Sequence, residues 1–145
     1  MTRLGKFLKL KPGDRRAFLE AAFWLGSFRA AMHFVPFKVL AGRLGTHQAE
    51  TPFVPLDAAT RRQAAAVSRA VRTMGRHLPW ACACLVQAAA AKRMLDRRRI
   101  PATLYLGTSK DENLKLIAHA WLRAGDAIVT GGEGKDGFTV VSTFS

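Results

Sequence analysis

"CLVQAAAAKRMLDRRRIPATLYLGT", residues 84–108, is the stretch in which the sequence pattern changes from helical to alternating. Up to residue 96 alanine and long apolar side chains dominate, and the basic run 97–99 suits the C-terminal end of a helix dipole. After Pro101 the stretch holds the β-branched and aromatic residues that strands favour. It therefore predicts a helix that begins near Cys82–Cys84 and a strand that begins after Pro101.

The rest of the chain follows the same division. Asp14 is placed to cap a helix that runs to about Phe34, and Asp57 opens another that runs to His77. Between them we expect a short helix over residues 36–45, which Gly45 ends, and a proline-containing connector over 46–56. After Pro101 we expect strands over 102–108, 115–124, 127–130 and 138–144, with the Gly125-Asp126 pair as a two-residue hairpin turn. Helices followed by an antiparallel sheet indicate the α+β class.

The composition adds a strong positive charge to this fold. Lys and Arg number 23 against 10 Asp and Glu, so the formal net charge of the 145 residues is +13. Such a protein attracts nucleic acid, acidic peptides or an anionic membrane surface. Arg61, Arg62, Arg69 and Arg72 lie along the helix that begins at Asp57, and we expect this helix to meet a partner or substrate, although a solvated helix face gives the same pattern.

The sequence predicts neither a transmembrane segment nor an export signal. The apolar stretch over residues 17–35 contains Glu20 and Arg29, and a charge at the centre of a membrane span costs about 2.5–3.5 kcal/mol. A buried amphipathic helix is the better interpretation. The basic N-terminus reaches no apolar segment before Pro12. We therefore expect a cytoplasmic protein with reduced thiols.

Two cysteines one residue apart, Cys82 and Cys84, stand at the head of the alanine-rich helix. A disulfide between residues i and i+2 is strained, and the pair lacks the two-residue spacer of thioredoxin-like motifs. A zinc site would need two more ligands, and no second Cys or His pair offers them. We expect no metal or other cofactor, and we interpret Cys82 as a buried small residue. Cys84 falls in the first helical turn, where free amides and the helix dipole favour thiolate over thiol.

His119 is the histidine that best complements this thiol. It lies in "AHAW", residues 118–121, inside an apolar strand where valine or isoleucine would be the ordinary choice. A neutral imidazole there could take the proton of Cys84 and return it to a leaving amine. A strand histidine taken alone is more often a core residue, and only the cysteine at the helix start favours a Cys84–His119 pair.

A third residue that would orient His119 is not evident. The expected hairpin brings residues 130–132 near His119, and none of them is a carboxylate. Asp126 lies at the turn itself, and Glu133 comes within reach only if the register slips or the loop folds back. Thr130, a backbone carbonyl or a residue from elsewhere therefore stay open for this role.

The segments "CLVQAAAAKRMLDRRRIPATLYLGT", "AHAWLRAGDAIVTGG" and "FTVVSTF" together resemble the bacterial lasso-peptide maturation proteases, leader peptidases with a transglutaminase-like, papain-related core. The N-terminal helices are also similar to that family, so the resemblance covers nearly the whole chain. It implies a single leader-peptidase domain over residues 1–145, with 1–56 as its helical N-terminal part and 57–145 as its catalytic core. It also implies that Cys84 is the nucleophile and His119 the base.

The same resemblance implies a reaction and its partners. Such an enzyme removes the leader from a ribosomally made precursor peptide, and an asparagine-synthetase-like macrocyclase then closes the core peptide into a lariat. A small leader-binding domain captures the precursor in this family. Since 145 residues leave little room for one, we expect a separate leader-binding protein in trans.

Two other functions stay open at this point. A basic protein that binds nucleic acid or a membrane surface without catalysis would explain the charge, but it would leave Cys84 and His119 without a role. A cysteine acyltransferase of the same fold would use the same two residues and would differ only in the acceptor, an amine in place of water. The protease interpretation expects no nucleic-acid partner.

Overall fold

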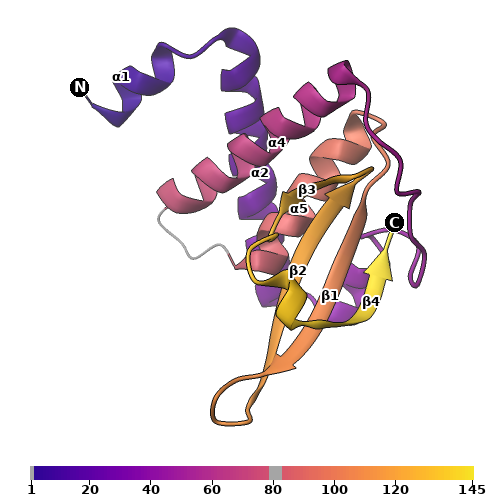
Figure 1. Ribbon diagram of the computed structural model, residues 1–145. Helices are drawn as coiled ribbons and strands as arrows, with labels where there is room; N and C mark the ends of the chain where they lie inside the picture. Colours follow the sequence, from indigo (N-terminus) through magenta and orange to yellow (C-terminus); the bar gives the residue numbers. More distant parts are fainter. Residues whose placement is uncertain (1, 79–82) are drawn as a thin grey trace.

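The computed structural model describes residues 2–78 and 83–145 and shows helices followed by strands (Figure 1). The elements are α1 (Arg3–Leu8), α2 (Pro12–Phe34), α3 (Phe37–Ala41), α4 (Ala58–His77), α5 (Cys84–Arg97), β1 (Thr103–Lys110), β2 (Leu116–Ala124), β3 (Ala127–Thr130), the 3₁₀ turn η1 (Lys135–Gly137) and β4 (Thr139–Phe144). The strands form one antiparallel sheet in the order β3-β2-β1-β4. The predicted α+β class is confirmed.

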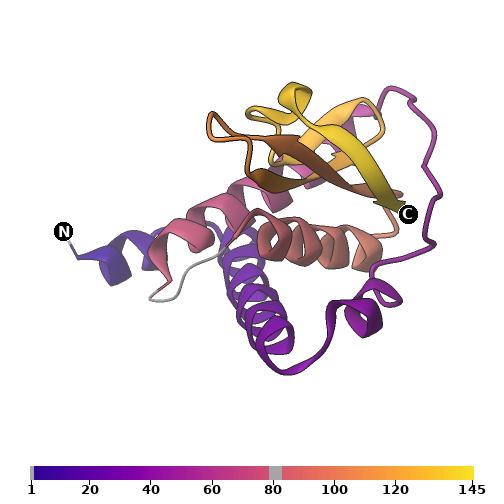
Figure 2. The same ribbon diagram turned by 90° about the horizontal axis from the view of Figure 1, so that it is seen from below.

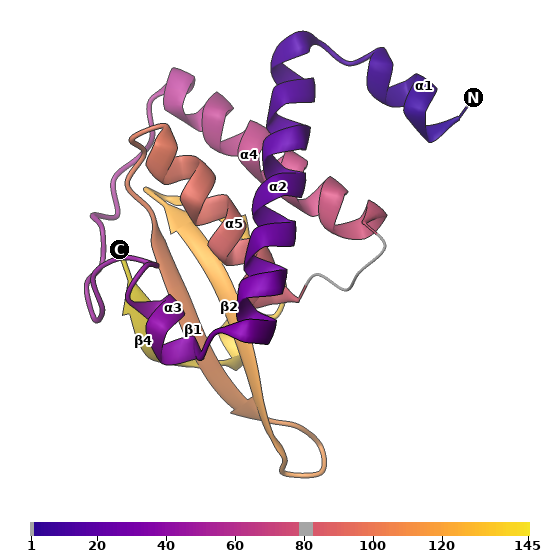
Figure 3. The same cartoon turned by 180° about the vertical axis from the view of Figure 1, so that it is seen from behind.

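The elements lie in layers around α5. Figure 2 shows the sheet on one side of α4 and α5, with α2 on the other side. Seen from behind, α2 passes across both helices (Figure 3). The fully buried side chains come from all three layers: Ala21 and Leu25 of α2, Val67 and Val71 of α4, Ala88 and Met94 of α5, and Leu104 and Leu122 of the sheet. One hydrophobic cluster therefore joins the N-terminal helices to the sheet.

The helix starts follow from local chemistry. Asp57 caps α4, since its Oδ1 accepts a hydrogen bond from the Thr60 amide at 2.6 Å. α2 begins earlier than the predicted Asp14 cap, with Lys11 as N-cap and Pro12 in the first position, because proline suits a position whose amide has no helical partner. The short third helix ends at Ala41, before the expected stop at Gly45.

The apolar stretch that the sequence places between residues 17 and 35 forms most of α2. Its side chains Ala17, Phe18, Ala21 and Leu25 are buried against the other helices. Within residues 2–78 and 83–145, no helix is both long and apolar enough to cross a lipid bilayer.

The β2–β3 hairpin turns at Gly125-Asp126, as predicted, with Gly125 at a φ of +56°. Ala124 pairs with Ala127, but farther from the turn Leu122 pairs with Thr130, so the register shifts by one residue. Such a bulge places two residues of one strand against one of the other and increases the local twist. It changes where the chain after β3 leaves the sheet.

A buried arginine holds the connector, residues 46–56, against the sheet. Arg123 is only 3% exposed, and its guanidinium donates to the carbonyls of Thr51 at 2.7 Å and Gly125 at 2.7 Å. Its Nε donates to the Tyr105 hydroxyl at 2.9 Å, and its Cζ lies 3.4 Å from the centroid of the Phe53 ring. Burial raises the pKa of Tyr105. Carbonyls, a hydroxyl and an aromatic ring thus satisfy this charge.

The start of the connector is tied to the end of β4. The Thr46 amide donates to the Ser145 carbonyl at 2.7 Å, and the Ser145 amide donates back at 3.1 Å. The His47 ring stacks on Phe144, with the ring centroids 5.1 Å apart. The connector therefore adds a short bridge beyond the β4 edge of the sheet.

Candidate active site

Cys84 is the first residue of α5, with Ala83 as N-cap, in agreement with the predicted helix start. Its side chain is partly buried and packs against the hydrophobic core. Among the described residues, no side chain caps this helix start and its first turn holds no acidic residue. The free amides of the first turn therefore face no competing anion from these residues. Cys82 lies outside the described residues.

His119 lies in β2 opposite Gly107 of β1. Its ring is held between Trp121, at a centroid distance of 5.8 Å, and Phe138, at 5.2 Å. Its Nε2 lies 2.7 Å from the carbonyl oxygen of Gly131. Because a carbonyl only accepts, Nε2 must carry the hydrogen, and Nδ1 of the neutral ring keeps its lone pair. The partner of His119 is thus a backbone carbonyl, one of the alternatives that the sequence left open.

Two glycines make this arrangement possible. Gly131 has a φ of +71°, and a Cβ there would collide with the Ala120 carbonyl oxygen and lie 3.0 Å from Trp121. A Cβ at Gly107 would lie 2.9 Å from both the Trp121 ring and Phe138. Only glycine lets the backbone approach this closely at both positions.

The other candidates for the third role make different contacts. Thr130 is 2% exposed, and its Oγ1 has no hydrogen-bond partner within the described ranges. Asp126 binds Arg61 at 2.9 Å, beside the hairpin turn. Glu133 binds Arg72 at 3.1 Å and is 92% exposed.

His119 opens into a cavity of about 360 Å³. Besides His119, its described lining residues come from α4, α5, β3 and the loop that follows β3: Arg72, Gln87, Ile128, Val129, Thr130, Gly131, Gly132 and Glu133. Gln87 lies three positions after Cys84, and side chains three apart in a helix share a face. The cavity therefore reaches the first turns of α5, one turn from the cysteine.

The structure gives Cys84 and His119 different surroundings. In the described part of the chain no hydrogen bond joins them, and Cys84 does not line the His119 cavity. Strand alternation explains this, because Ala120 and Leu122 face the core with α5, whereas His119 shares the other face of β2 with Trp121. The lining of the His119 cavity nevertheless includes Gln87 of α5, together with Thr130 at the end of β3.

The sequence model of the transglutaminase-like superfamily matches residues 31–143. The chain belongs to the transglutaminase-like superfamily. The predicted transglutaminase-like core is confirmed, and this membership indicates a cysteine-dependent hydrolase or transferase. The transglutaminase-like region begins within α2 and ends in β4, so it contains both Cys84 and His119. No curated protein and no solved structure matches the chain significantly.

Sequence reasoning missed two contributors to this transglutaminase-like site. Gln87 lines the cavity. The sequence alone could have indicated this residue, because it is the only polar side chain between Cys84 and Lys92. Phe138 packs on the His119 ring, and nothing local marks it, because its position depends on the sheet. Among the described residues, no three Cys, His, Asp or Glu side chains are grouped to hold a metal ion.

Proposed function

We propose that the protein is a cysteine endopeptidase that removes the leader peptide from a ribosomally synthesised lasso-peptide precursor before macrocyclisation. The observation that carries this proposal is the presence, within one transglutaminase-like region, of a cysteine at a helix start that no described side chain caps and of a histidine whose ring is hydrogen-bonded to Gly131. The choice of a leader peptide as substrate is supported by the resemblance of the segments around Cys84 and His119 to the lasso-peptide maturation proteases.

In the proposed reaction Nδ1 of His119 takes the thiol proton, and Cys84 Sγ attacks the scissile carbonyl carbon. The resulting oxyanion accepts hydrogen bonds from the free amides in the first turn of α5. The carbon–nitrogen bond then breaks, and His119 gives its proton to the leaving amine. A water molecule, deprotonated by His119, attacks the thioester and releases the leader carboxylate and the Cys84 thiol.

This mechanism requires Cys84 Sγ and His119 Nδ1 to come within hydrogen-bond distance. Catalytic hydrogen bonds in substrate-free proteins are often long and tighten when substrate binds. The edge of β2 beyond Thr130 is the place where the two groups would meet, because the His119 cavity there reaches Gln87 of α5.

The partners belong to the proposal as well. A separate leader-binding protein would deliver the precursor in trans, which raises the effective concentration of the scissile bond. The asparagine-synthetase-like macrocyclase would then use the core peptide, whose new amino group this cleavage exposes. All of these components would act in the cytoplasm.

The test is to substitute the two residues separately. Cys84→Ala and His119→Ala should each abolish leader removal, because thiolate attack and proton return act as a unit, and circular dichroism should show an unchanged fold. Cys82→Ala is the matched control and should keep most of the activity. A folded Cys84→Ala variant that cleaves precursor as fast as wild type would rule out the proposal.

Alkylation identifies the reactive thiol without any substrate. Iodoacetamide should label Cys84 faster than Cys82, and the difference should shrink in His119→Ala. Mass spectrometry of the digested protein locates the label. Preferential labelling of Cys82 would mean that the nucleophile is the other cysteine.

A cysteine acyltransferase is the second candidate, because membership in the superfamily covers transferases as well as hydrolases. Both reactions pass through the same thioester on Cys84 and differ in what attacks it. Adding a primary amine to the cleavage assay separates them. A hydrolase releases the leader as a free acid, whereas a transferase releases it as the amide of the added amine.

A further inference from the structure

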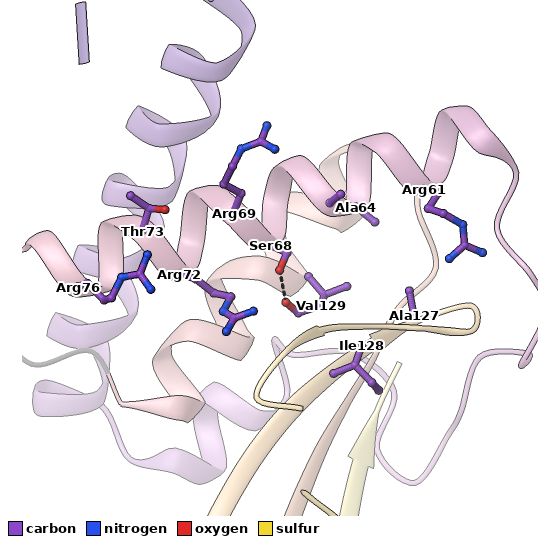
Figure 4. Close-up of a pocket in the computed structure, with 11 residues that line it drawn as sticks. Arg61, Ala64, Ser68, Arg69, Arg72, Thr73, Arg76, Ala127, Ile128 and Val129 are labelled. Atoms are coloured by element: carbon purple, nitrogen blue, oxygen red, sulfur yellow. Dashed lines mark hydrogen bonds between the residues drawn. The ribbon is translucent and has the colours of Figure 1, made fainter. Parts of the chain in front are cut away.

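A groove lined by arginines runs between α4 and the edge strand β3 (Figure 4). Its volume is about 490 Å³, and four arginines of α4 line it: Arg61, Arg69, Arg72 and Arg76. Between α4 and β3, the Ser68 hydroxyl donates to the Val129 carbonyl at 2.6 Å and so ties the helix to the strand. Arg62, which the sequence groups with these arginines, does not line the groove.

The groove adjoins the His119 cavity. The two spaces share Arg72, Ile128 and Val129 as lining residues. The buried Thr130 hydroxyl, which has no partner in the described part of the chain, lies on the His119 side of this junction. An extended chain bound along α4 is therefore directed toward the candidate active site.

Three of the groove arginines form ion pairs that are exposed to solvent and therefore weak. Arg61, Arg69 and Arg72 bind Asp126, Asp14 and Glu133, and all three pairs are exposed to solvent. Exposed ion pairs contribute little to stability, because water and salt screen them. Carboxylates of a ligand can replace these partners at small cost. Arg76 has no carboxylate partner among the described residues, and it extends the positive charge along the groove.

The rest of the lining favours a peptide over a nucleic acid. Proteins that bind single-stranded nucleic acid combine basic grooves with aromatic side chains on which bases stack. The described residues of this groove include no aromatic side chain, and its apolar surface comes from small or aliphatic residues: Ala64, Ala65, Ala127, Ile128 and Val129.

We propose that this groove binds an acidic segment of the peptide substrate and thereby aligns its scissile bond with the His119 cavity. The inference rests on the proposed function, because it names the substrate segment that the same site accepts. It commits to a peptide rich in Asp and Glu, with arginine–carboxylate contacts along α4.

Binding is measured on the full chain carrying Cys84→Ala, so that no chemistry interferes. The probe is a short fluorescein-labelled peptide in which Glu and Ala alternate, and the readout is fluorescence anisotropy. The groove variant carries Arg69→Gln, Arg72→Gln and Arg76→Gln. The control variant carries Arg16→Gln, Arg43→Gln and Arg62→Gln, which remove the same charge from exposed positions outside the groove.

The groove variant should bind the peptide at least about tenfold more weakly than the parent. The affinity of the control variant for the peptide should fall by less than about twofold. Added salt should weaken peptide binding by the parent more than peptide binding by the groove variant. An equal loss of peptide affinity in the groove and control variants would overturn the inference, because net charge alone would then explain the binding. A single-stranded oligonucleotide that binds more tightly than the peptide and displaces it would also overturn it, in favour of a nucleic-acid surface.

These outcomes are independent of the proposed function. Suppose that the cleavage assay shows Cys84 to be dispensable while the groove variant still binds the peptide more weakly than the control variant. The protease proposal then fails, and the groove remains an acidic-peptide site. If Cys84 is essential for cleavage while both triple variants bind the peptide equally well, the groove inference alone fails.

Discussion

The contact between His119 and Gly131 gives the imidazole an orientation without giving it a counter-charge. A carboxylate in this position would orient the ring and also stabilise the imidazolium that forms during proton transfer. A backbone carbonyl supplies a dipole only. The 2.7 Å hydrogen bond therefore orients the ring together with the packing of Trp121 and Phe138, and it depends on the left-handed backbone at Gly131.

Gly131→Ala should therefore slow the proposed leader removal at least about tenfold, because the added Cβ collides with the Ala120 carbonyl and displaces the oxygen that holds His119. Gly134→Ala is the matched control. Gly134 has nearly the same φ, +76°, but a Cβ there meets nothing within 4 Å. The two variants share the backbone strain at a positive φ, but only the Cβ at residue 131 meets neighbouring atoms, those of Ala120 and Trp121.

Nitrogen NMR of His119 tests whether the Gly131 carbonyl orients the ring or Gly131 only supports the local fold. In wild type and in Gly134→Ala the ring should be in the tautomer that carries its hydrogen on Nε2, and Gly131→Ala should lose this preference. Equal cleavage rates and equal tautomer populations in the two alanine variants would show that the Gly131 carbonyl does not orient His119.

At the scale of elements, α4 has two tasks, since it carries the groove arginines and holds β3 through Ser68. Its start depends on the Asp57 cap. A hydrogen bond from the Thr60 amide lowers the pKa of Asp57 below its usual value of 3.8. A carboxyl whose pKa is lower in the folded state stabilises the fold above the unfolded pKa, and this contribution is lost as the pH falls through the folded pKa.

Replacing Asp57 by Asn keeps an acceptor oxygen but removes the titration. We expect wild type to have a Tm a few degrees above that of Asp57→Asn at pH 7, because the ionised cap also interacts favourably with the helix dipole. This difference should vanish below the lowered pKa of Asp57. Thermal unfolding of both proteins at pH 7 and in acid measures this Tm difference. The titration of the other carboxyls affects both proteins equally and therefore cancels in the comparison. A difference that stays constant with pH would refute the assignment.

At the scale of the whole molecule, the hydrophobic core does not follow the limits of the family match. The match begins at residue 31, inside α2, yet Phe18, Ala21 and Leu25 of the same helix are buried against α4 and α5. The helical N-terminal part is thus a layer of the core. Removing it uncovers the surfaces of α4 and α5 that Phe18, Ala21 and Leu25 cover.

A chain that starts at residue 31 should therefore fail to unfold cooperatively and should bind a dye for exposed apolar surface. A chain that lacks only residues 1–5 is the control, because Leu4 is 66% exposed and α1 buries no residue. Circular dichroism during heating distinguishes the two. Cooperative melting of the 31–145 chain at the Tm of the full chain would show that α2 does not support the core.

Much of this architecture was predictable from local patterns. The starts of α4 and α5, the Gly125-Asp126 turn and the order of helices and strands follow from capping residues, glycines and the change of period after Pro101. The six-residue helix α1 was not predicted, because it has too few turns for a detectable period.

The details of the site depend on contacts between distant segments. The position of Cys84 at a helix start follows from the sequence, but the bulge at Leu122 and the carbonyl of Gly131 do not. Every residue has a carbonyl, so the sequence alone does not mark the one that binds His119. The burial of Arg123 is equally hidden, because two of the carbonyls that it binds lie in the connector, about seventy positions away.

The bridge between the connector and the end of β4 has a consequence for the order in which the protein folds. It joins residues 46–48 to residues 143–145, so its hydrogen bonds connect the segment before α4 to the end of the last strand. During synthesis Thr46 leaves the ribosome well before Ser145, and the helices can pack while the connector still lacks these partners. Contacts this distant in sequence are slow to form. Closure of the connector is therefore a late event that waits until residues 143–145 have emerged.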